Sequence, residues 1–126
     1  MPISMRLEPE SGVVIMTGSG VLHVADAIEA ARASWSAPAR TDGTTVWDFR
    51  AAQFDLSSSE IREIAEFILQ NQPIPPPRKV AFVTKRDVDF GLARMFEVFR
   101  ESSVTAFRVC RDYEEALRWA RWHDVE

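Results

Sequence analysis

Residues 44–67 have the sequence TTVWDFRAAQFDLSSSEIREIAEF, in which a strand pattern passes directly into a helix pattern. The segment 44–49 is rich in β-branched and aromatic side chains, which favour strands. The helix that follows has an apolar face at helical spacing, formed by Ile61, Ile64, Ala65 and Ile68. A strand that leads into an amphipathic helix is the repeating unit of parallel sheets, so this segment predicts an α/β fold.

The chain before this segment predicts a hairpin and a further helix. Residues 3–9 alternate apolar and polar side chains, as in a half-buried strand. A turn at residues 11–12 leads to the apolar run VVIMT at 13–17, which is typical of a central strand. After GSG at 18–20, apolar residues recur at helical spacing, at Val24, Ala27, Ile28, Ala31 and Trp35.

The chain after this segment continues the alternation. Prolines at 73–77 end the second helix, because proline cannot continue it. The remaining elements are predicted as strand 79–84, helix 87–102, strand 106–110 and helix 112–124. The predicted order is β-β-α-β-α-β-α-β-α in one domain, residues 1–126. Its mixed five-stranded sheet has four parallel strands and an antiparallel first strand, with four helices.

Composition excludes several classes of protein. The net charge of -4 argues against a nucleic-acid-binding protein, which usually carries a basic excess. The single cysteine, Cys110, forms no intrachain disulfide and is predicted to be a buried thiol. No apolar run approaches the roughly 18 residues of a membrane span, so the chain is not expected to be transmembrane. The N-terminal residues lack a signal-peptide pattern, and we expect a cytoplasmic protein.

Four stretches resemble the uncharacterised bacterial SpoIIAA-like/STAS family. They are GVVIMTGSGVLHVAD at 12–26, VWDFRAAQFDLSSSEI at 46–61, KVAFVTKRDVDFGLARMFEVF at 79–99 and FRVCRDYEEALRW at 107–119. STAS domains and anti-sigma-factor antagonists share that fold. The resemblance implies a non-catalytic regulatory or protein-interaction module. The likeness of this fold to lipid-carrying CRAL-TRIO domains implies the alternative, a carrier of a lipid or other small apolar ligand.

The three serines at 57–59 allow two interpretations. Ser57 and Glu60 have the spacing of a capping box, which would account for Ser57 as a helix cap. In anti-sigma-factor antagonists a serine of the corresponding loop is phosphorylated, and the charge decides which partner binds. That resemblance implies that Asp55, Ser57 and Ser58 form a phosphoacceptor or partner loop. The sequence leaves both interpretations open.

A second candidate site follows from the topology. In open parallel sheets, ligands bind beyond the carboxyl ends of the strands. The residues predicted at those ends are Ser19, Gly20, Asp48, Lys85, Arg86 and Arg111. They would form a cleft for an anion or another ligand. The alternative is that Gly18 and Gly20 form a tight strand-to-helix turn while the charged side chains are solvated.

A third candidate site is apolar. Large apolar side chains lie on the third and fourth predicted helices, at Phe90, Met95, Phe99, Trp119 and Trp122. They would form a surface for an apolar ligand or for a homodimer, or they pack within the chain.

Catalysis has little support in the sequence. His23 and His123 are far apart in the sequence and neither lies in a catalytic motif. No nucleophile elbow and no set of metal ligands at ligand spacing is present. We therefore expect no enzyme, no metal and no cofactor, and a protein or a small apolar molecule as the partner.

Overall fold

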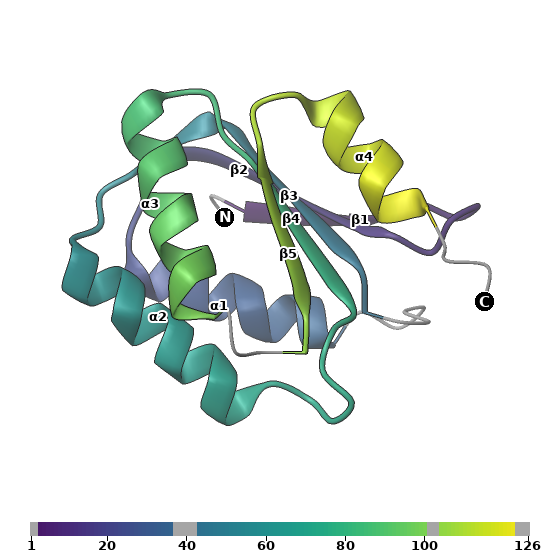
Figure 1. Ribbon diagram of the computed structural model, residues 1–126, viewed down its shortest axis with the longest axis horizontal. Helices are drawn as coiled ribbons and strands as arrows, with labels where there is room; N and C mark the ends of the chain where they lie inside the picture. Colours follow the sequence, from purple (N-terminus) through teal and green to yellow (C-terminus); the bar gives the residue numbers. More distant parts are fainter. Residues whose placement is uncertain (1–2, 37–42, 101–103, 123–126) are drawn as a thin grey trace.

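The computed structural model describes residues 3–36, 43–100 and 104–122. The elements follow the predicted order (Figure 1). They are β1 Ile3–Leu7, β2 Val14–Leu22, α1 Val24–Trp35, β3 Thr45–Phe54, α2 Ser58–Asn71, β4 Lys79–Val83, α3 Asp87–Phe99, β5 Ala106–Cys110 and α4 Tyr113–Arg121. Strand β1 pairs antiparallel with β2, and β2 to β5 pair in parallel. The predicted fold class is therefore confirmed.

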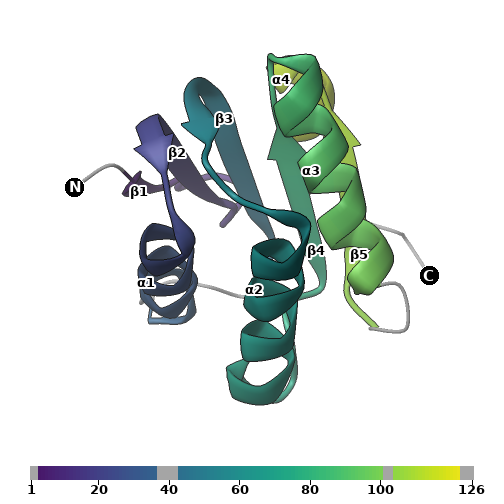
Figure 2. The same ribbon diagram turned by 90° about the vertical axis from the view of Figure 1, so that its left-hand side faces the viewer.

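The order of the strands in the sheet is the same as their order along the chain. Parallel strands are joined by right-handed crossovers. Because each crossover advances in the same direction across the sheet, α1, α2 and α3 all lie on one face (Figures 1 and 2). Helix α4 follows the last strand and covers the opposite face (Figure 1).

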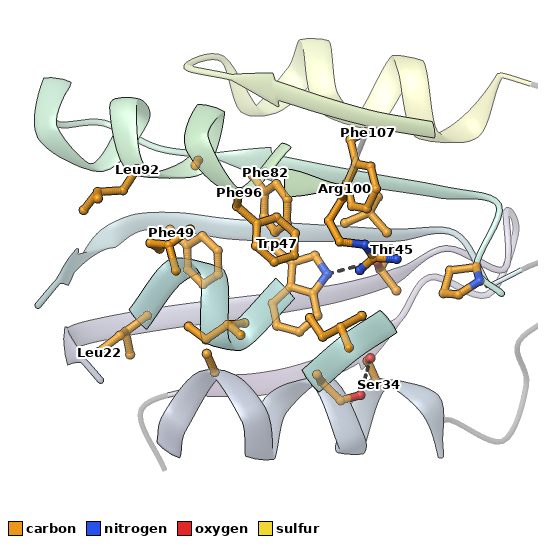
Figure 3. Close-up of a pocket in the computed structure, with 18 of the residues that line it drawn as sticks. Leu22, Ser34, Thr45, Trp47, Phe49, Phe82, Leu92, Phe96, Arg100 and Phe107 are labelled. Carbon is orange, nitrogen blue, oxygen red and sulfur yellow. Dashed lines mark hydrogen bonds between the residues drawn. The ribbon is translucent and has the colours of Figure 1, made fainter. Parts of the chain in front are cut away.

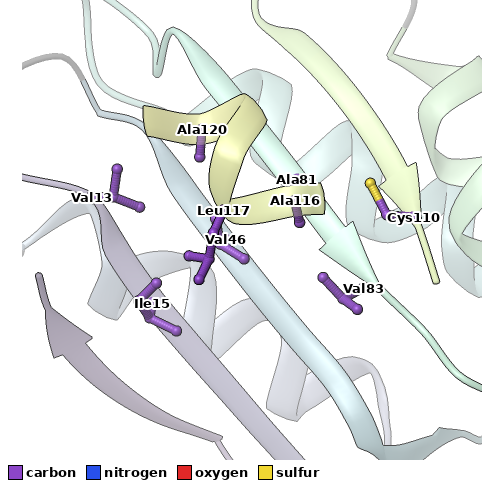
Figure 4. Close-up of a cluster of buried hydrophobic side chains, with 9 residues drawn as sticks. All are labelled: Val13, Ile15, Val46, Ala81, Val83, Cys110, Ala116, Leu117 and Ala120. Atoms are coloured by element: carbon purple, nitrogen blue, oxygen red, sulfur yellow. The ribbon is translucent and has the colours of Figure 1, made fainter. Parts of the chain in front are cut away.

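The face under α4 is closely packed. Alternate residues of the strands point to this face, as the period of two in a strand requires. Helix α4 contributes two alanines and a leucine, which allow it to approach the sheet closely (Figure 4). The cluster consists of Val13, Ile15, Val46, Ala81, Val83, Cys110, Ala116, Leu117 and Ala120. Burial in this cluster raises the pKa of the Cys110 thiol, which keeps it in the unreactive protonated form.

Two strands are longer than the sequence predicts. Strand β2 continues through Gly18, Ser19 and Gly20, so the alternative of a strand-to-helix turn at these residues is wrong. The pairing of β2 with β3 shifts between Thr17 and Ser19, and Gly20 has a φ of 73°. This irregularity lets β2 stay paired with β3 as far as Phe54, beyond the ends of β4 and β5. The two strands extend each other, because the backbone of each supplies the hydrogen-bond partners of the other. A local sequence pattern does not contain this tertiary pairing.

Some apolar residues of strand β1 and helix α3 are exposed in the structure. On edge strand β1, Ile3 is buried, while Met5 and Leu7 are exposed. On α3, Val88 is exposed and the neighbouring Asp89 is buried instead. Asp89 lies inside because its carboxylate accepts hydrogen bonds there, which a pattern of apolar spacing does not register.

An ion pair attaches the β1–β2 turn to the end of α4. Arg121 Nε donates to Glu8 Oε1 at 2.8 Å, and the Ser11 hydroxyl donates to the same carboxylate. These hydrogen bonds, those of Arg121 first, lower the pKa of Glu8 from 4.5 to about 2. The carboxylate therefore stabilises the folded state above its unfolded pKa, and this contribution is lost as the pH falls from about 4.5 to about 2.

We expect Glu8→Gln to lower the stability at pH 7 and to flatten its decline between pH 4.5 and 2. The amide cannot change charge in this range, so folding no longer depends on that proton. Urea denaturation at a series of pH values measures the effect. Glu10→Gln, at an exposed position of the same turn, is the control and should retain the wild-type pH profile. A wild-type profile in Glu8→Gln would contradict the assignment.

Candidate functional site

A cavity of about 120 Å³ lies between the sheet and the three helices on its face (Figure 3). It forms because the three helices pack against different parts of the structure. Helix α1 packs on β1 and β2, and α3 packs on β3 and β5. Helix α2 packs chiefly against α1 and α3. It therefore covers the middle of the sheet from a distance and leaves a hollow beneath it.

Aromatic rings form the floor of the cavity. Trp47 and Phe49 of β3, Phe82 of β4 and Phe107 of β5 all point to the helical side (Figure 3). The Phe82 ring stacks with Phe49 at 6.2 Å and with Phe107 at 6.4 Å between centroids. Although β4 is an interior strand, Phe82 remains partly exposed, because the space above it is not filled.

Aliphatic side chains form the roof. Helix α2 points its apolar face downward, and the predicted residues of that face, except Ala65, line the cavity: Ile61, Ile64 and Ile68. Helix α1 lines it with small residues, Ala27 and Ala31, which take up little of the space. The walls are therefore apolar on both sides, as in sites for small apolar ligands.

One end of the cavity is polar. Arg100 caps the C-terminus of α3, and its side chain is only 3% exposed. Its Nη2 donates to Gln72 Oε1 at 3.1 Å, and Gln72 is itself the C-cap of α2. Thr105 lies at this end and donates to the Pro77 carbonyl oxygen at 2.6 Å. This polar end is formed by helix C-termini and strand beginnings, opposite to the strand ends that the sequence favoured.

The carboxyl ends of the strands hold paired charges rather than a basic cleft. Burial acts to raise the pKa of Asp48, but hydrogen bonds from the Arg50 guanidinium and backbone N–H lower it overall. The Arg50 guanidinium also lies over the Tyr113 ring of α4. Ser19 and Gly20 lie in the extension of β2 and are exposed. The predicted members of this site are thus spread over two faces of the sheet.

Two of the three predicted cations at this edge bind carboxylates of α3. Arg86 Nε donates to Asp89 Oδ2 at 2.8 Å, and Arg111 Nη1 donates to Asp87 Oδ1 at 2.6 Å. Lys85 is exposed next to them. An anion at this edge would compete with carboxylates that already occupy the guanidinium groups.

The serine loop forms the predicted cap. Ser57 Oγ accepts from the Glu60 N–H at 3.2 Å, and Glu60 accepts from the Ser57 N–H at 2.8 Å. The Ser57 and Ser59 hydroxyls lie 3.1 Å apart, and Ser58 is exposed at the first position of α2. Asp55 lies within 3.1 Å of His23 Nε2, which connects the loop to the start of α1. Ser57 is therefore a helix cap in the structure. Phosphorylation of the loop stays a prediction.

The predicted apolar surface is divided between distant places. Met95 and Phe99 pack against a buried cluster between α2 and α3, which consists of Ile61, Ile64, Ala65 and Phe96. The Arg111 guanidinium lies over the Phe90 ring at the start of α3. Trp119 and Trp122 lie on the α4 side, where Lys79 Nζ is 5.2 and 5.4 Å from their ring centroids. The structure does not bring these five residues together. A homodimer surface stays a prediction.

Metal binding and membrane insertion have no support within the described residues. No group of three or more His, Cys, Asp or Glu side chains is placed there to hold a metal ion. No helix in the part of the chain that the structure describes is long and apolar enough to cross a membrane. His23 is an exposed helix cap, and its backbone N–H donates to Asp26 Oδ2 at 2.9 Å. His123 lies outside the described residues.

Sequence reasoning missed the residues that form the cavity. The floor residues Trp47, Phe49, Phe82 and Phe107 were placed in strands but were assigned to no site. The sequence places Trp47 and Phe49 on one face of the strand, but it does not show that the space above these two rings is left unfilled. The predicted C-terminus of the third helix also contained Arg100, whose burial the pattern does not show.

The chain is similar to a solved structure of an uncharacterized protein from Shewanella loihica PV-4, a DUF3478 family member with a SpoIIAA-like fold. The two chains share 17% sequence identity with a TM-score of 0.56, over 94% of this chain and 91% of the other. The chain matches no family model and no curated protein. A likeness at this identity shows the fold, which is SpoIIAA-like, and leaves the function to the geometry of the site.

Proposed function

We propose that this protein with a SpoIIAA-like fold is a non-catalytic module that binds a small apolar molecule between its sheet and helices α1 to α3. The observation that carries the proposal is the apolar cavity of about 120 Å³. A cavity of about 150 Å³ in an unrelated engineered protein stays dry and takes up benzene. A hollow of this size and polarity therefore favours an apolar guest over water.

The lining of the cavity supports a binding role rather than catalysis. Among the described residues that line it, Arg100 is the one ionisable side chain. The Ser34 and Thr105 hydroxyls donate to backbone carbonyls, and Thr45 Oγ1 accepts from the Trp47 indole at 2.9 Å. General acid–base chemistry uses an imidazole, carboxylate, amine, phenol or thiol, and a serine or threonine nucleophile needs an adjacent base. The described lining offers a guanidinium, which stays protonated.

We expect benzene to bind in this cavity and to shift the methyl NMR signals of Leu22, Ile64 and Leu92, which line it. Ala31→Leu places a larger side chain into the cavity from α1 and should abolish the binding by occupying the space. Ala25→Leu makes the same change at an exposed position of α1 and should bind benzene as the wild type does.

The outcomes of this titration are distinguishable. Shifts confined to residues that line the cavity, and lost only in Ala31→Leu, would support the proposal. An absence of any shift at saturating benzene in the wild type would refute it. Equal binding by all three proteins would place the benzene elsewhere and would also refute it.

A second candidate function is a partner-binding switch at the start of α2. It is favoured by the exposed hydroxyls of Ser57 and Ser58 on the helix that covers the cavity. A phosphate on either serine would face a helix N-terminus, which favours anions. Intact mass and peptide mapping of the protein from its own cells provide the test. A population heavier by one phosphate on Ser57 or Ser58 supports the switch, and unmodified protein under all growth conditions argues against it.

A further inference from the structure

Aromatic rings line one side of the cavity and contact one another. They come from strands β3, β4 and β5 and from helix α3 (Figure 3). The rings of this network are Trp47, Phe49, Phe54, Phe82, Phe96 and Phe107. The residues with which helix α2 lines the cavity are isoleucines. A guest in the cavity can therefore contact aromatic rings on the floor and aliphatic side chains in the roof.

Phe82 lies at the centre of this network. Its ring is stacked with Phe49 and Phe107 on the neighbouring strands. Phe96 of α3 lies nearly perpendicular to it, at 5.5 Å between centroids. Phe49 and Phe96 are buried, but Phe82 remains partly exposed although β4 is an interior strand. The surrounding rings therefore leave part of Phe82 to the cavity.

The angles between the rings show which contacts the floor can offer to a guest. Aromatic pairs prefer offset-stacked or edge-to-face arrangements, with centroids about 4.5–7 Å apart. The planes of Phe49 and Phe82 differ by 14°, and those of Phe82 and Phe96 by 88°, so the network contains both arrangements. The attraction in such pairs comes from the ring quadrupoles and adds to the effect of burial. A saturated guest would gain from burial alone.

We propose that the cavity binds a ligand with a single aromatic ring, and that this ring lies against Phe82. The volume of about 120 Å³ is close to that of the engineered cavity that takes up benzene, so it suits one six-membered ring. The partly exposed Phe82 ring provides the contact that distinguishes an aromatic guest from a saturated one. This assignment rests on the proposed function and specifies the chemical class of its ligand.

The test compares benzene with cyclopentane by NMR titration. Cyclopentane is a saturated ring of similar volume and is more hydrophobic than benzene, so burial alone would favour it. The wild type should bind benzene at least about fivefold more tightly, because only benzene adds contacts between rings. Phe82→Leu keeps an apolar side chain but removes the ring, so it should lose this preference while still binding cyclopentane. Phe90→Leu makes the same change outside the cavity lining and should keep the preference.

Each outcome of the comparison is decisive. Equal affinity of the wild type for the two compounds, or tighter binding of cyclopentane, would overturn the aromatic assignment and leave the apolar-ligand function intact. Failure of the wild type to bind either compound would overturn both. A preference that persists in Phe82→Leu, or that disappears in Phe90→Leu, would also overturn the assignment. If Phe82→Leu does not fold, the wild-type preference and nuclear Overhauser contacts between bound benzene and the Phe82 ring decide the question.

Discussion

Asp89→Ala is expected to lower the free energy of unfolding by about 3 kcal/mol, measured by urea denaturation. The Asp89 carboxylate is 1% exposed and accepts from the Phe54 N–H at 3.0 Å and from Arg86 Nε at 2.8 Å. Alanine would leave the Phe54 N–H without its acceptor beside a small void. The Arg86 side chain is 42% exposed, so its guanidinium can turn to water at lower cost.

Asp87 provides the matched control, because it lies in the same helical turn and also pairs with an arginine. Its side chain is 92% exposed, and an exposed ion pair contributes about 0–1 kcal/mol. Asp87→Ala should therefore change the stability little. Asp89→Asn should fall between the two, since its amide oxygen still accepts from Phe54. Similar midpoints for Asp87→Ala and Asp89→Ala would contradict this account of the buried carboxylate.

Gly18→Val is expected to destabilise the fold by about 2–3 kcal/mol. A Cβ atom at Gly18 would lie 2.9 Å from Phe49 Cδ1, which is closer than packed atoms approach, and 3.3 Å from Leu22 Cδ1, which is a tight contact. Because Phe49 lines the cavity, its ring would move into that space. The variant should therefore lose stability and benzene binding together, and both are measured on one sample by denaturation and by NMR titration.

Gly91 is the control for this substitution. A Cβ atom there meets nothing within 4 Å, and the residue lies inside helix α3. Gly91→Ala should raise the stability by about 0.5–1 kcal/mol, because glycine loses more backbone entropy than alanine in a helix. A Gly18 variant as stable as the wild type, with benzene still bound, would show that Phe49 is not confined by this glycine.

The order of the elements was predictable because the hydrophobic period changes clearly at each boundary. The strand predicted at 106–110 is found at these residues, and the last predicted helix is found at residues 113–121. The capping box at Ser57 was equally predictable, since it depends on two residues that are three positions apart. Structural features that depend on the spacing of nearby residues can therefore be predicted from the sequence.

The extensions of β2 and β3 depend instead on pairing between distant segments. Gly18, Ser19 and Gly20 have low strand propensity, and they are extended because residues 51–54 lie beside them. The burial of the Asp89 side chain likewise depends on a hydrogen bond from the Phe54 N–H, 35 residues away. Neither partner is visible from the local pattern.

The cavity could not be predicted, for a geometric reason. Apolar residues were expected at a ligand site, and the sequence pointed to the most prominent ones on helices, such as Phe90 and Trp122. The space in the structure lies above Trp47 and Phe82, because α2 is supported by neighbouring helices rather than by the sheet. The distance of a helix from a sheet depends on how all layers pack, and no residue pattern reports it.

The order of strands in the sheet, which is also their order along the chain, has a consequence for synthesis. Each strand pairs with the one made just before it, so the sheet can grow on the ribosome without waiting for a later strand. The far face is different, because α4, at residues 113–121, covers Val13, Ile15 and Val46 only after all five strands have been made. A nascent chain that stalls before this helix would present a bare apolar sheet to chaperones.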